Sequence, residues 1–250
     1  MMWLEQEIFN LLFGVAKMVV TKDMMVDWAS EALKAYTATL LAQTKAARTA
    51  QSAPPPVAMP VVLPPPAQSV PAQMNAYDDK FKRMVINADR LPDASAVAKR
   101  ILSGRARYQT ASTMTGVPWW FIGILHYRES NCDFETYLGN GQSLHEQTTT
   151  VPKGRGPFRT FEDGCLDAMR YEHLDKITDW HVGAALFQME EFNGEGYRNH
   201  GLPSPYVWGG SNQYSVGKYV ADGVFSPTAV DTQLGGAVIL RMLQTLVTQL

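Results

Sequence analysis

Cysteine is scarce in this chain, and so are long apolar runs. Two cysteines among 250 residues are too few for a disulfide-stabilised scaffold or for a zinc site built on cysteine. The five histidines show no spacing typical of metal ligands, so we expect no metal site. No stretch approaches the run of about 18 apolar residues that indicates a transmembrane helix, so we expect no membrane-spanning segment.

An excess of charge of one sign is also lacking. The 22 Lys and Arg residues are nearly balanced by 24 Asp and Glu residues, which gives a formal net charge of −2. A dedicated nucleic-acid-binding protein normally carries a strong basic excess, so we expect no nucleic-acid partner. Hydrophobic residues make up 46% of the chain, an ordinary globular value that excludes disorder throughout.

Proline is concentrated in one segment. Residues 52–72 hold eight of the fifteen prolines and no charged side chain. Such a segment has few backbone donors and favours polyproline II, so it predicts a semi-rigid linker, with a ligand for an SH3-type domain as the alternative. The composition therefore divides the chain into an N-terminal segment (1–50), a Pro/Ala-rich linker (51–74) and a domain (75–250).

The N-terminal segment has two helical patterns, at residues 3–20 and 24–48. The second has apolar residues at the alternating three-four spacing of a helix that packs on a partner, namely Val26, Ala29, Leu33, Tyr36 and Leu40. We expect residues 1–50 to self-associate or to dock on a partner or a membrane surface. The first pattern does not match a cleavable signal peptide, because Glu5 and Glu7 stand where positive charge is needed. The sequence leaves the export route open.

The domain is predicted to be mainly α-helical. Basic residues exceed acidic ones in residues 78–107, which favours one or two helices with a basic outer face. Capping and breaking residues place four more helices: from Pro118 to about Ser130, from Thr160 to about Leu174, from Asp179 to Glu191 with Gly194 after it, and from Thr228 to Leu246, opened by Ser226-Pro227. Asn140-Gly141 and the run 148–151 predict a small β-hairpin within residues 137–159.

Glu129 is the residue most suited to catalysis. It ends a predicted helix whose preceding turns are almost entirely apolar and aromatic. Partial burial would disfavour the charged carboxylate and raise its pKa. A glutamate that keeps its proton near neutral pH can act as a general acid. The alternative is a surface glutamate paired with its neighbour Arg128.

The motifs around Glu129 resemble those of a known family. Gly116-Val117-Pro118 is followed by the apolar helix ending in Glu129-Ser130 and then by Asp133-Phe134. This order resembles the signature of the lysozyme superfamily, and is most similar to goose-type lysozymes and soluble lytic transglycosylases. The later segment 192–197 is similar to a second motif of that superfamily. Residues 112–245 also resemble bacterial and phage-associated lysozyme-like proteins, through 140–141, 151–152, 193–194, 204–206 and 218–223.

The resemblance implies a two-lobed lysozyme-like fold and an activity that needs no cofactor. The implied reaction cleaves peptidoglycan strands between N-acetylmuramic acid and N-acetylglucosamine, at the cell wall or in the periplasm. Glu129 would be the general acid, and Ser130 would orient it or contact the sugar, unless Ser130 only makes a helix-end hydrogen bond. A chitinase-like hydrolase and a non-catalytic wall-binding or assembly protein are the alternatives, since fold does not establish activity.

The sequence does not identify a second carboxylate. Glycoside hydrolases normally use one as nucleophile or base, whereas lytic transglycosylases use the substrate's own 6-hydroxyl. The candidates are Asp133, Glu135, Glu146 and Glu190, and the hydroxyl of Thr148 could position a water. Asp133 is more simply explained as a turn-capping residue. Glu190, one helical turn before Asn193, could point into the cleft, with a helix-surface salt bridge as the equal alternative.

Sugar binding needs aromatic faces and amide or hydroxyl groups. By analogy with the resembling folds, the candidates are Tyr137, Asn140, Asn193, Tyr197, Tyr206 and Trp208, each of which could instead pack in the core. Cys132 and Cys165 are expected to be free thiols, with a disulfide between them as the alternative if the chain works outside the cytoplasm.

Overall fold

The computed structural model describes residues 69–221 and 223–248. The predictions for residues 1–50 and for most of the linker lie outside these residues. By its contacts the chain divides into Met1–Val61 and Val62–Leu250, and every described residue belongs to the second unit. Helix α3 begins at Val70, with a proline in its first turn, and so lies partly within the predicted linker.

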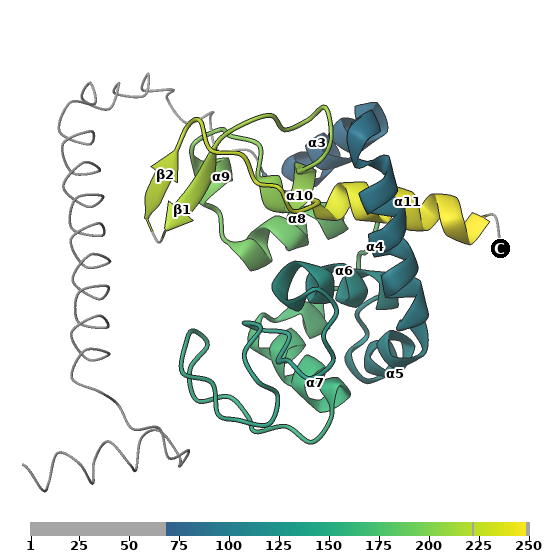
Figure 1. Cartoon of the computed structure of the whole chain (residues 1–250), viewed down its shortest axis with the longest axis vertical. Coiled ribbons are helices and arrows are strands. Elements are labelled where there is room, and N and C mark those ends of the chain that lie inside the picture. Colours follow the sequence, from purple (N-terminus) through teal and green to yellow (C-terminus); the bar gives the residue numbers. More distant parts are fainter. Residues whose placement is uncertain (1–68, 222, 249–250) are drawn as a thin grey trace, which may run out of the picture. The chain divides into compact units, whose positions relative to one another are not determined.

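The described part of the chain is mainly helical with one two-stranded antiparallel hairpin, which confirms the predicted class (Figure 1). Its α-helices are α3 (Val70–Arg83), α4 (Leu91–Ser103), α5 (Arg105–Thr115), α6 (Trp119–Ser130), α7 (Phe161–Tyr171), α8 (Val182–Asn193), α9 (Gly196–Asn199), α10 (Pro205–Trp208) and α11 (Gly236–Thr248). Two 3₁₀ turns, Ala88–Arg90 and Leu174–Lys176, and strands β1 (Lys218–Ala221) and β2 (Val224–Ser226) complete it. None of the described helices is both long and apolar enough to cross a membrane.

Helix α6 lies at the centre of this domain. It follows Pro118, as predicted, and ends at Asn131, which takes the left-handed conformation with φ of 57°. The seven residues from Phe121 to Tyr127 are all buried. Figure 1 shows α6 between α5, α7 and the long loop before α7 on one side, and α8, α10 and α11 on the other. Burial on every face explains why α6 is apolar all round rather than amphipathic.

Helices α7 and α8 also lie close to their predicted positions. The side chain of Thr160 accepts a hydrogen bond from the Asp163 backbone nitrogen (3.1 Å) and so caps α7, as predicted. Helix α8 starts later than predicted, because Asp179 accepts a hydrogen bond from the nitrogen of His181 (3.1 Å), and His181 is the residue that precedes the helix. Gly194 ends α8, as predicted, with φ of 98°.

The hairpin was predicted at the wrong place. Residues 137–159 form a loop without named strands, and Ser143 in this loop makes an isolated bridge with Thr136, which precedes it. Asn140-Gly141 does form a tight turn, but Thr149 and Thr150 donate their backbone N–H groups to the side chain of Gln142 (2.9 and 3.0 Å) instead of to a strand. The observed hairpin pairs Lys218 with Ser226 and Tyr219 with Phe225.

The last helix was predicted to start too early. Ser226 ends β2, and its hydroxyl accepts a hydrogen bond from the nitrogen of Ala229 (3.2 Å), which turns the chain instead of opening a helix. Gly235 donates its backbone N–H to the carbonyl of Gly209 (2.8 Å), and α11 begins only after this contact. Residues 227–235 therefore form a loop, which runs close to the end of α6.

Candidate active site

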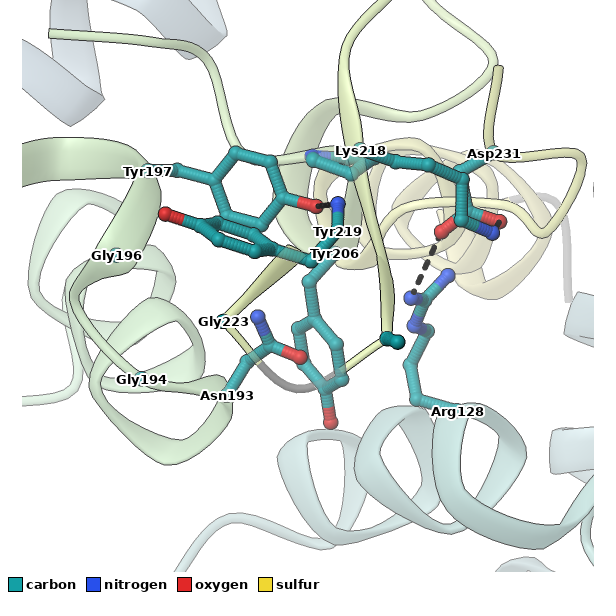
Figure 2. Close-up of a pocket in the computed structure, with 12 residues that line it drawn as sticks. Arg128, Asn193, Gly194, Gly196, Tyr197, Tyr206, Lys218, Tyr219, Gly223 and Asp231 are labelled. Atoms are coloured by element: carbon teal, nitrogen blue, oxygen red, sulfur yellow. Dashed lines mark hydrogen bonds and ion pairs between the residues drawn. The ribbon is translucent and has the colours of Figure 1, made fainter. Parts of the chain in front are cut away.

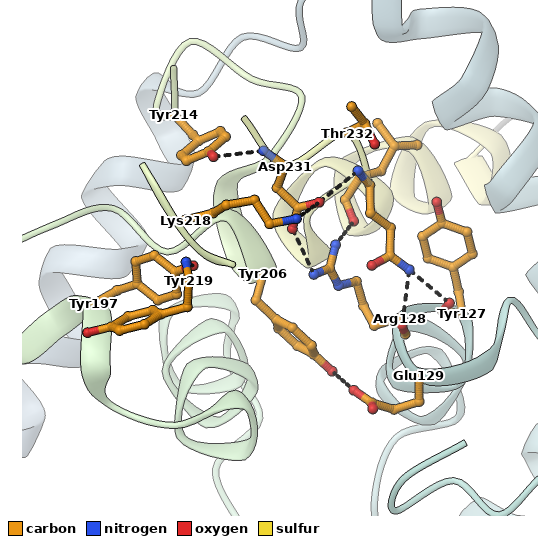
Figure 3. A network of polar contacts seen from close by, with 12 residues as sticks. Tyr127, Arg128, Glu129, Tyr197, Tyr206, Tyr214, Lys218, Tyr219, Asp231 and Thr232 are labelled. Atoms are coloured by element: carbon orange, nitrogen blue, oxygen red, sulfur yellow. Dashed lines mark hydrogen bonds and ion pairs between the residues drawn. The ribbon is translucent and has the colours of Figure 1, made fainter. Parts of the chain in front are cut away.

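Glu129 lies in the last turn of α6, where the hydroxyl of Tyr206 donates a hydrogen bond of 2.8 Å to its Oε1 (Figure 3). Burial raises the pKa of Glu129, while the hydrogen bond from Tyr206 and the charge of Arg128 act in the opposite direction. The effect of burial is the largest, so the pKa lies above that of an ordinary glutamate. This confirms the environment that the sequence predicted around this carboxyl group.

Tyr206 is the residue that fixes the Glu129 carboxyl group. It belongs to the short helix α10 and is buried, and burial raises the pKa of its hydroxyl well above the usual value. The hydroxyl therefore keeps its proton and remains a hydrogen-bond donor. The guanidinium of Arg128 lies 4.4 Å from the centre of the Tyr206 ring, a cation–π contact that holds the ring from the α6 side.

A cavity of about 540 Å³ is lined by Arg128 and Tyr206, whereas Glu129 is not a lining residue and meets the cavity through its hydrogen bond with Tyr206 (Figure 2). Its walls come from α6, from the α8–α9 turn, from α10, from the hairpin and from the loop before α11. The lining residues are Arg128, Asn193, Gly194, Gly196, Tyr197, Pro205, Tyr206, Lys218, Tyr219, Ala221, Gly223 and Asp231. Tyrosines, an asparagine and a few charged groups on a concave surface are suited to a polar, ring-containing ligand such as a sugar.

Arg128 and Asp231 form a buried charged pair in one wall of the cavity. Arg128 Nη2 lies 3.5 Å from Asp231 Oδ2, and their side chains are 6% and 14% exposed. Lys218 Nζ lies 3.6 Å from the other oxygen, Oδ1. The backbone nitrogen of Asp231 donates a hydrogen bond to the hydroxyl of Tyr214 (2.9 Å). The carboxylate is therefore held in place from its side chain and from its backbone.

The loop before α11 also binds the end of α6. Arg128 Nη1 donates to the carbonyl of Leu234 (2.9 Å), and Gln233 Nε2 donates to the carbonyl of Arg128 (3.0 Å). The last carbonyls of a helix have no partner within the helix, so the Gln233 amide satisfies one of them. These contacts fix the helix turn that carries Glu129.

Tyr197 connects α9 to the hairpin. Its hydroxyl accepts a hydrogen bond from the backbone nitrogen of Tyr219 (2.9 Å), and the two rings meet edge to face with centroids 5.1 Å apart. Asn193, at the end of α8, is exposed and lines the same cavity. The structure thus places three predicted binding residues, Asn193, Tyr197 and Tyr206, around one cavity next to Glu129.

Three other predicted binding residues make contacts within the protein. Ser130 donates to the carbonyl of His126 (3.3 Å), the helix-end hydrogen bond given as its alternative. Tyr137 is buried and donates to Asp167 (2.9 Å). Asn140 accepts from the nitrogen of Gln142 (3.1 Å). None of these three lines the cavity, and the predicted Trp208 is buried in the core.

The 140–141 turn nevertheless lies against the end of α6. Gly141 has φ of 71°, and a Cβ atom there would be 2.8 Å from the backbone carbonyl oxygen of Glu129. This close approach explains a glycine at the position on two grounds, backbone conformation and space.

The candidates for a second catalytic group lie outside the cavity. Thr148 is buried, and its hydroxyl donates to the carbonyl of Pro152 (2.6 Å) and accepts from the nitrogen of Arg155 (2.9 Å). Both contacts hold the loop together, so they account for the hydroxyl without a bound water. Glu146 is exposed. Neither residue lines the cavity.

Glu190 is buried between α3 and α8 instead of on the helix surface. The hydroxyl of Tyr77 donates to its Oε2, and burial raises the pKa of Glu190. Of the remaining candidates, Asp133 accepts a hydrogen bond from the nitrogen of Glu135 (3.0 Å), as expected of a turn cap. Glu135 forms an exposed pair with His145 (3.0 Å).

Several cavity residues were missed in the sequence, namely Arg128 as a lining group, Lys218, Tyr219 and Asp231. Lys218 and Tyr219 belong to the segment 218–223 that carried part of the family resemblance, but the sequence indicated no role for them. Nothing in the sequence around Asp231 indicated a site. Cys132 and Cys165 are free thiols, and the described residues contain no group of three or more possible metal ligands among His, Cys, Asp and Glu.

Comparison with known proteins adds no relative: no family model, no curated protein and no solved structure matches the chain.

Proposed function

We propose that this protein is a peptidoglycan-cleaving glycosidase, a muramidase or a lytic transglycosylase, with Glu129 as its general acid. The observation that carries the proposal is the buried Glu129 carboxyl group, with a raised pKa, next to a cavity lined by Arg128 and Tyr206. The substrate is the β-1,4 bond between N-acetylmuramic acid and N-acetylglucosamine, and the protein acts at the cell wall or in the periplasm. The domain has the two-lobed architecture of the lysozyme superfamily.

The hydrogen bond from Tyr206 gives the two carboxyl oxygens of Glu129 different roles in the proposed reaction. Oε1 accepts a hydrogen bond from the tyrosine hydroxyl, which keeps its proton, so the transferable proton is carried by Oε2. Burial keeps this proton on the carboxyl group at a higher pH than in water. A general acid works best when its pKa lies near the working pH, which the raised pKa of Glu129 favours.

The reaction begins when Glu129 gives its proton to the glycosidic oxygen. The bond from that oxygen to C1 of the muramyl residue breaks, and an oxocarbenium-like centre forms at C1. The nucleophile that attacks C1 is either water or the 6-hydroxyl of the same residue. In both cases the nucleophile loses one proton, which returns to the Glu129 carboxylate and restores the acid.

The surroundings of Asp231 favour the pathway that needs only one carboxylate. Asp231 is the one carboxylate among the described residues that line the cavity. Its oxygens face Arg128 and Lys218, and Oδ1 also accepts a hydrogen bond from the nitrogen of Gln233 (3.1 Å). A carboxylate engaged in this way is a poor nucleophile. Attack by the 6-hydroxyl, with a 1,6-anhydromuramyl product, is therefore our preferred route.

The test is digestion of purified peptidoglycan by the full chain and by Glu129→Gln. The amide keeps the size of the side chain but has no acidic proton, so we expect a loss of activity of about 10²–10⁴-fold, the usual contribution of general acid catalysis. Glu146→Gln is the matched control, because Glu146 is exposed and outside the cavity. Equal activity of wild type and Glu129→Gln would refute the proposal.

Mass analysis of the products separates the two reactions. Ends that carry 1,6-anhydromuramic acid indicate a transglycosylase, and reducing muramic ends indicate a hydrolase. Folded wild-type protein that releases no products from several wall types would instead support a non-catalytic wall-binding role.

A further inference from the structure

The charged groups of the cavity are not balanced. Among its described lining residues, Arg128 and Lys218 are cationic and Asp231 is anionic. Figure 2 shows Asn193 on one side of Tyr206 and the Arg128–Asp231 pair on the other. The cavity thus has a neutral amide on one side and an excess of positive charge on the other.

The two cations are engaged to different extents. Arg128 is 6% exposed, donates to the Leu234 carbonyl and to Asp231, and covers the Tyr206 ring, so its contacts lie within the protein. Lys218 lies about as far from Asp231 (3.6 Å) as Arg128 does (3.5 Å), but its side chain is 33% exposed. An ammonium group has three donors. Lys218 is therefore the cation that can bind a ligand.

Asp231 lies beside Lys218 but neutralises the positive charge of Lys218 only in part. The same carboxylate also faces Arg128, so one negative charge is shared between two positive ones. The excess of positive charge favours binding of an anionic group near Lys218, because charge attraction is stronger where the surrounding side chains exclude water. A carboxylate is the anion that a glycan of the proposed class supplies.

We propose that Lys218 contacts a carboxylate on the sugar strand bound in this cavity and makes the site prefer an acidic glycan over a neutral one. The inference rests on the proposed function and names its substrate more closely. A muramyl residue supplies a carboxylate either from its free lactyl group or from an attached stem peptide. A polymer of N-acetylglucosamine alone has neither, so it gains nothing from the lysine.

The test measures binding, so that it does not depend on cleavage. The full chain carrying Glu129→Gln is titrated with three soluble oligosaccharides of equal length: muramyl glycan with stem peptides, the same glycan after an amidase has removed them, and chitin oligosaccharide. The titrations are repeated with Lys218→Met, which keeps the aliphatic length and removes the charge, and with Lys218→Arg. Lys99→Met, on the exposed face of α4, is the control.

We expect Lys218→Met to weaken binding of the acidic glycan about tenfold and to leave binding of chitin within about twofold, as for the loss of one hydrogen bond to a charged group. Lys218→Arg should keep most of the preference for the acidic glycan over chitin, and added salt should reduce this preference. An effect on the glycan with stem peptides alone assigns the carboxylate to the peptide. An effect on the amidase-treated glycan alone assigns it to the lactyl group, whose carboxyl is an amide while the peptide is attached. An effect on both shows that Lys218 accepts a carboxylate from either source.

Equal weakening of acidic and neutral glycans by Lys218→Met would show a structural role for the lysine and overturn the inference. An unchanged preference would overturn it as well. Neither outcome bears on cleavage, which is decided separately by wild type and Glu129→Gln on peptidoglycan. A melting temperature for each variant shows whether a lost preference reflects lost folding.

Discussion

Removal of the Tyr206 hydroxyl tests the link between the structure and the acid role of Glu129. Tyr206→Phe keeps the buried ring under Arg128 and deletes the 2.8 Å hydrogen bond to Glu129 Oε1. This bond stabilises the charged carboxylate and therefore lowers the pKa of Glu129. Without the hydrogen bond, only the charge of Arg128 opposes the effect of burial, so the pKa of Glu129 rises further above its usual value.

The shift follows from the difference in the strength of the bond between the two protonation states of Glu129. A hydrogen bond to a charged group contributes roughly 1.5–3 kcal/mol, and about 1.4 kcal/mol corresponds to one pKa unit. Because the bond is stronger to the charged carboxylate than to the neutral acid, we expect the pKa of Glu129 to rise in Tyr206→Phe. A general acid works while it is protonated, so activity is present below this pKa and is lost as the pH rises through it. The alkaline limb of the profile must then move to higher pH in Tyr206→Phe.

The assay is the pH dependence of kcat/KM on soluble peptidoglycan fragments. The rate at the optimum should fall as well, because the carboxyl group is no longer oriented by the tyrosine. Tyr137→Phe is a matched control, since Tyr137 is also a buried tyrosine that donates to a carboxylate, Asp167, at 2.9 Å, outside the cavity. An alkaline limb that stays in place in Tyr206→Phe, or moves to lower pH, would refute the assignment of Glu129 as the titrating acid.

Two further predictions concern the loop beside α6. Gly141→Ala should destabilise the protein by more than the roughly 1–2 kcal/mol of a left-handed backbone and should lower activity, because the new methyl group meets the Glu129 carbonyl oxygen. Gly154→Ala has a similar φ of 75° but its nearest neighbour at 4.0 Å, so in urea unfolding and activity assays the difference between the two variants isolates that contact. Thr148→Val should cost about 1–3 kcal/mol by leaving two backbone groups unpaired, with kcat unchanged. A lower kcat at unchanged stability would instead return Thr148 to the list of catalytic candidates.

Local signals predicted the helices around the site well. Pro118 and Thr160 act at helix starts through their own backbone or side chain, so neighbouring residues are enough to recognise them. The environment of Glu129 could also be predicted, because an apolar run long enough for several helical turns must be buried. The partner of that carboxyl group could not, since Tyr206 follows 77 residues later and reaches it only through the packing of α10 against α6.

The hairpin was misplaced because the sequence contains two dipeptides that are equally typical of hairpin turns. Asn140-Gly141 and Asp222-Gly223 are both dipeptides typical of tight hairpin turns. At the first, the side chain of Gln142 takes the backbone donors of Thr149 and Thr150, so no ladder forms. The second stands between residues of high β-propensity, at 219–220 and 224–225, and these form the observed strands. The residues of high β-propensity on both sides of 222–223 were the signal that could have located the hairpin.

The position of Asp231 at the cavity could not be predicted from a sequence pattern. Its neighbours form a loop without a motif, and its role arises from Lys218 on strand β1 and from Arg128, which lies on a helix 103 residues earlier in the chain. The four carboxylates that the sequence offered as a second catalytic group all lie outside the cavity. The acid that does line the cavity faces two cations, Arg128 and Lys218. The proposed single-carboxylate mechanism and the proposed preference for an acidic glycan thus depend on the same three side chains, of which Lys218 is the most exposed and the most suitable to change.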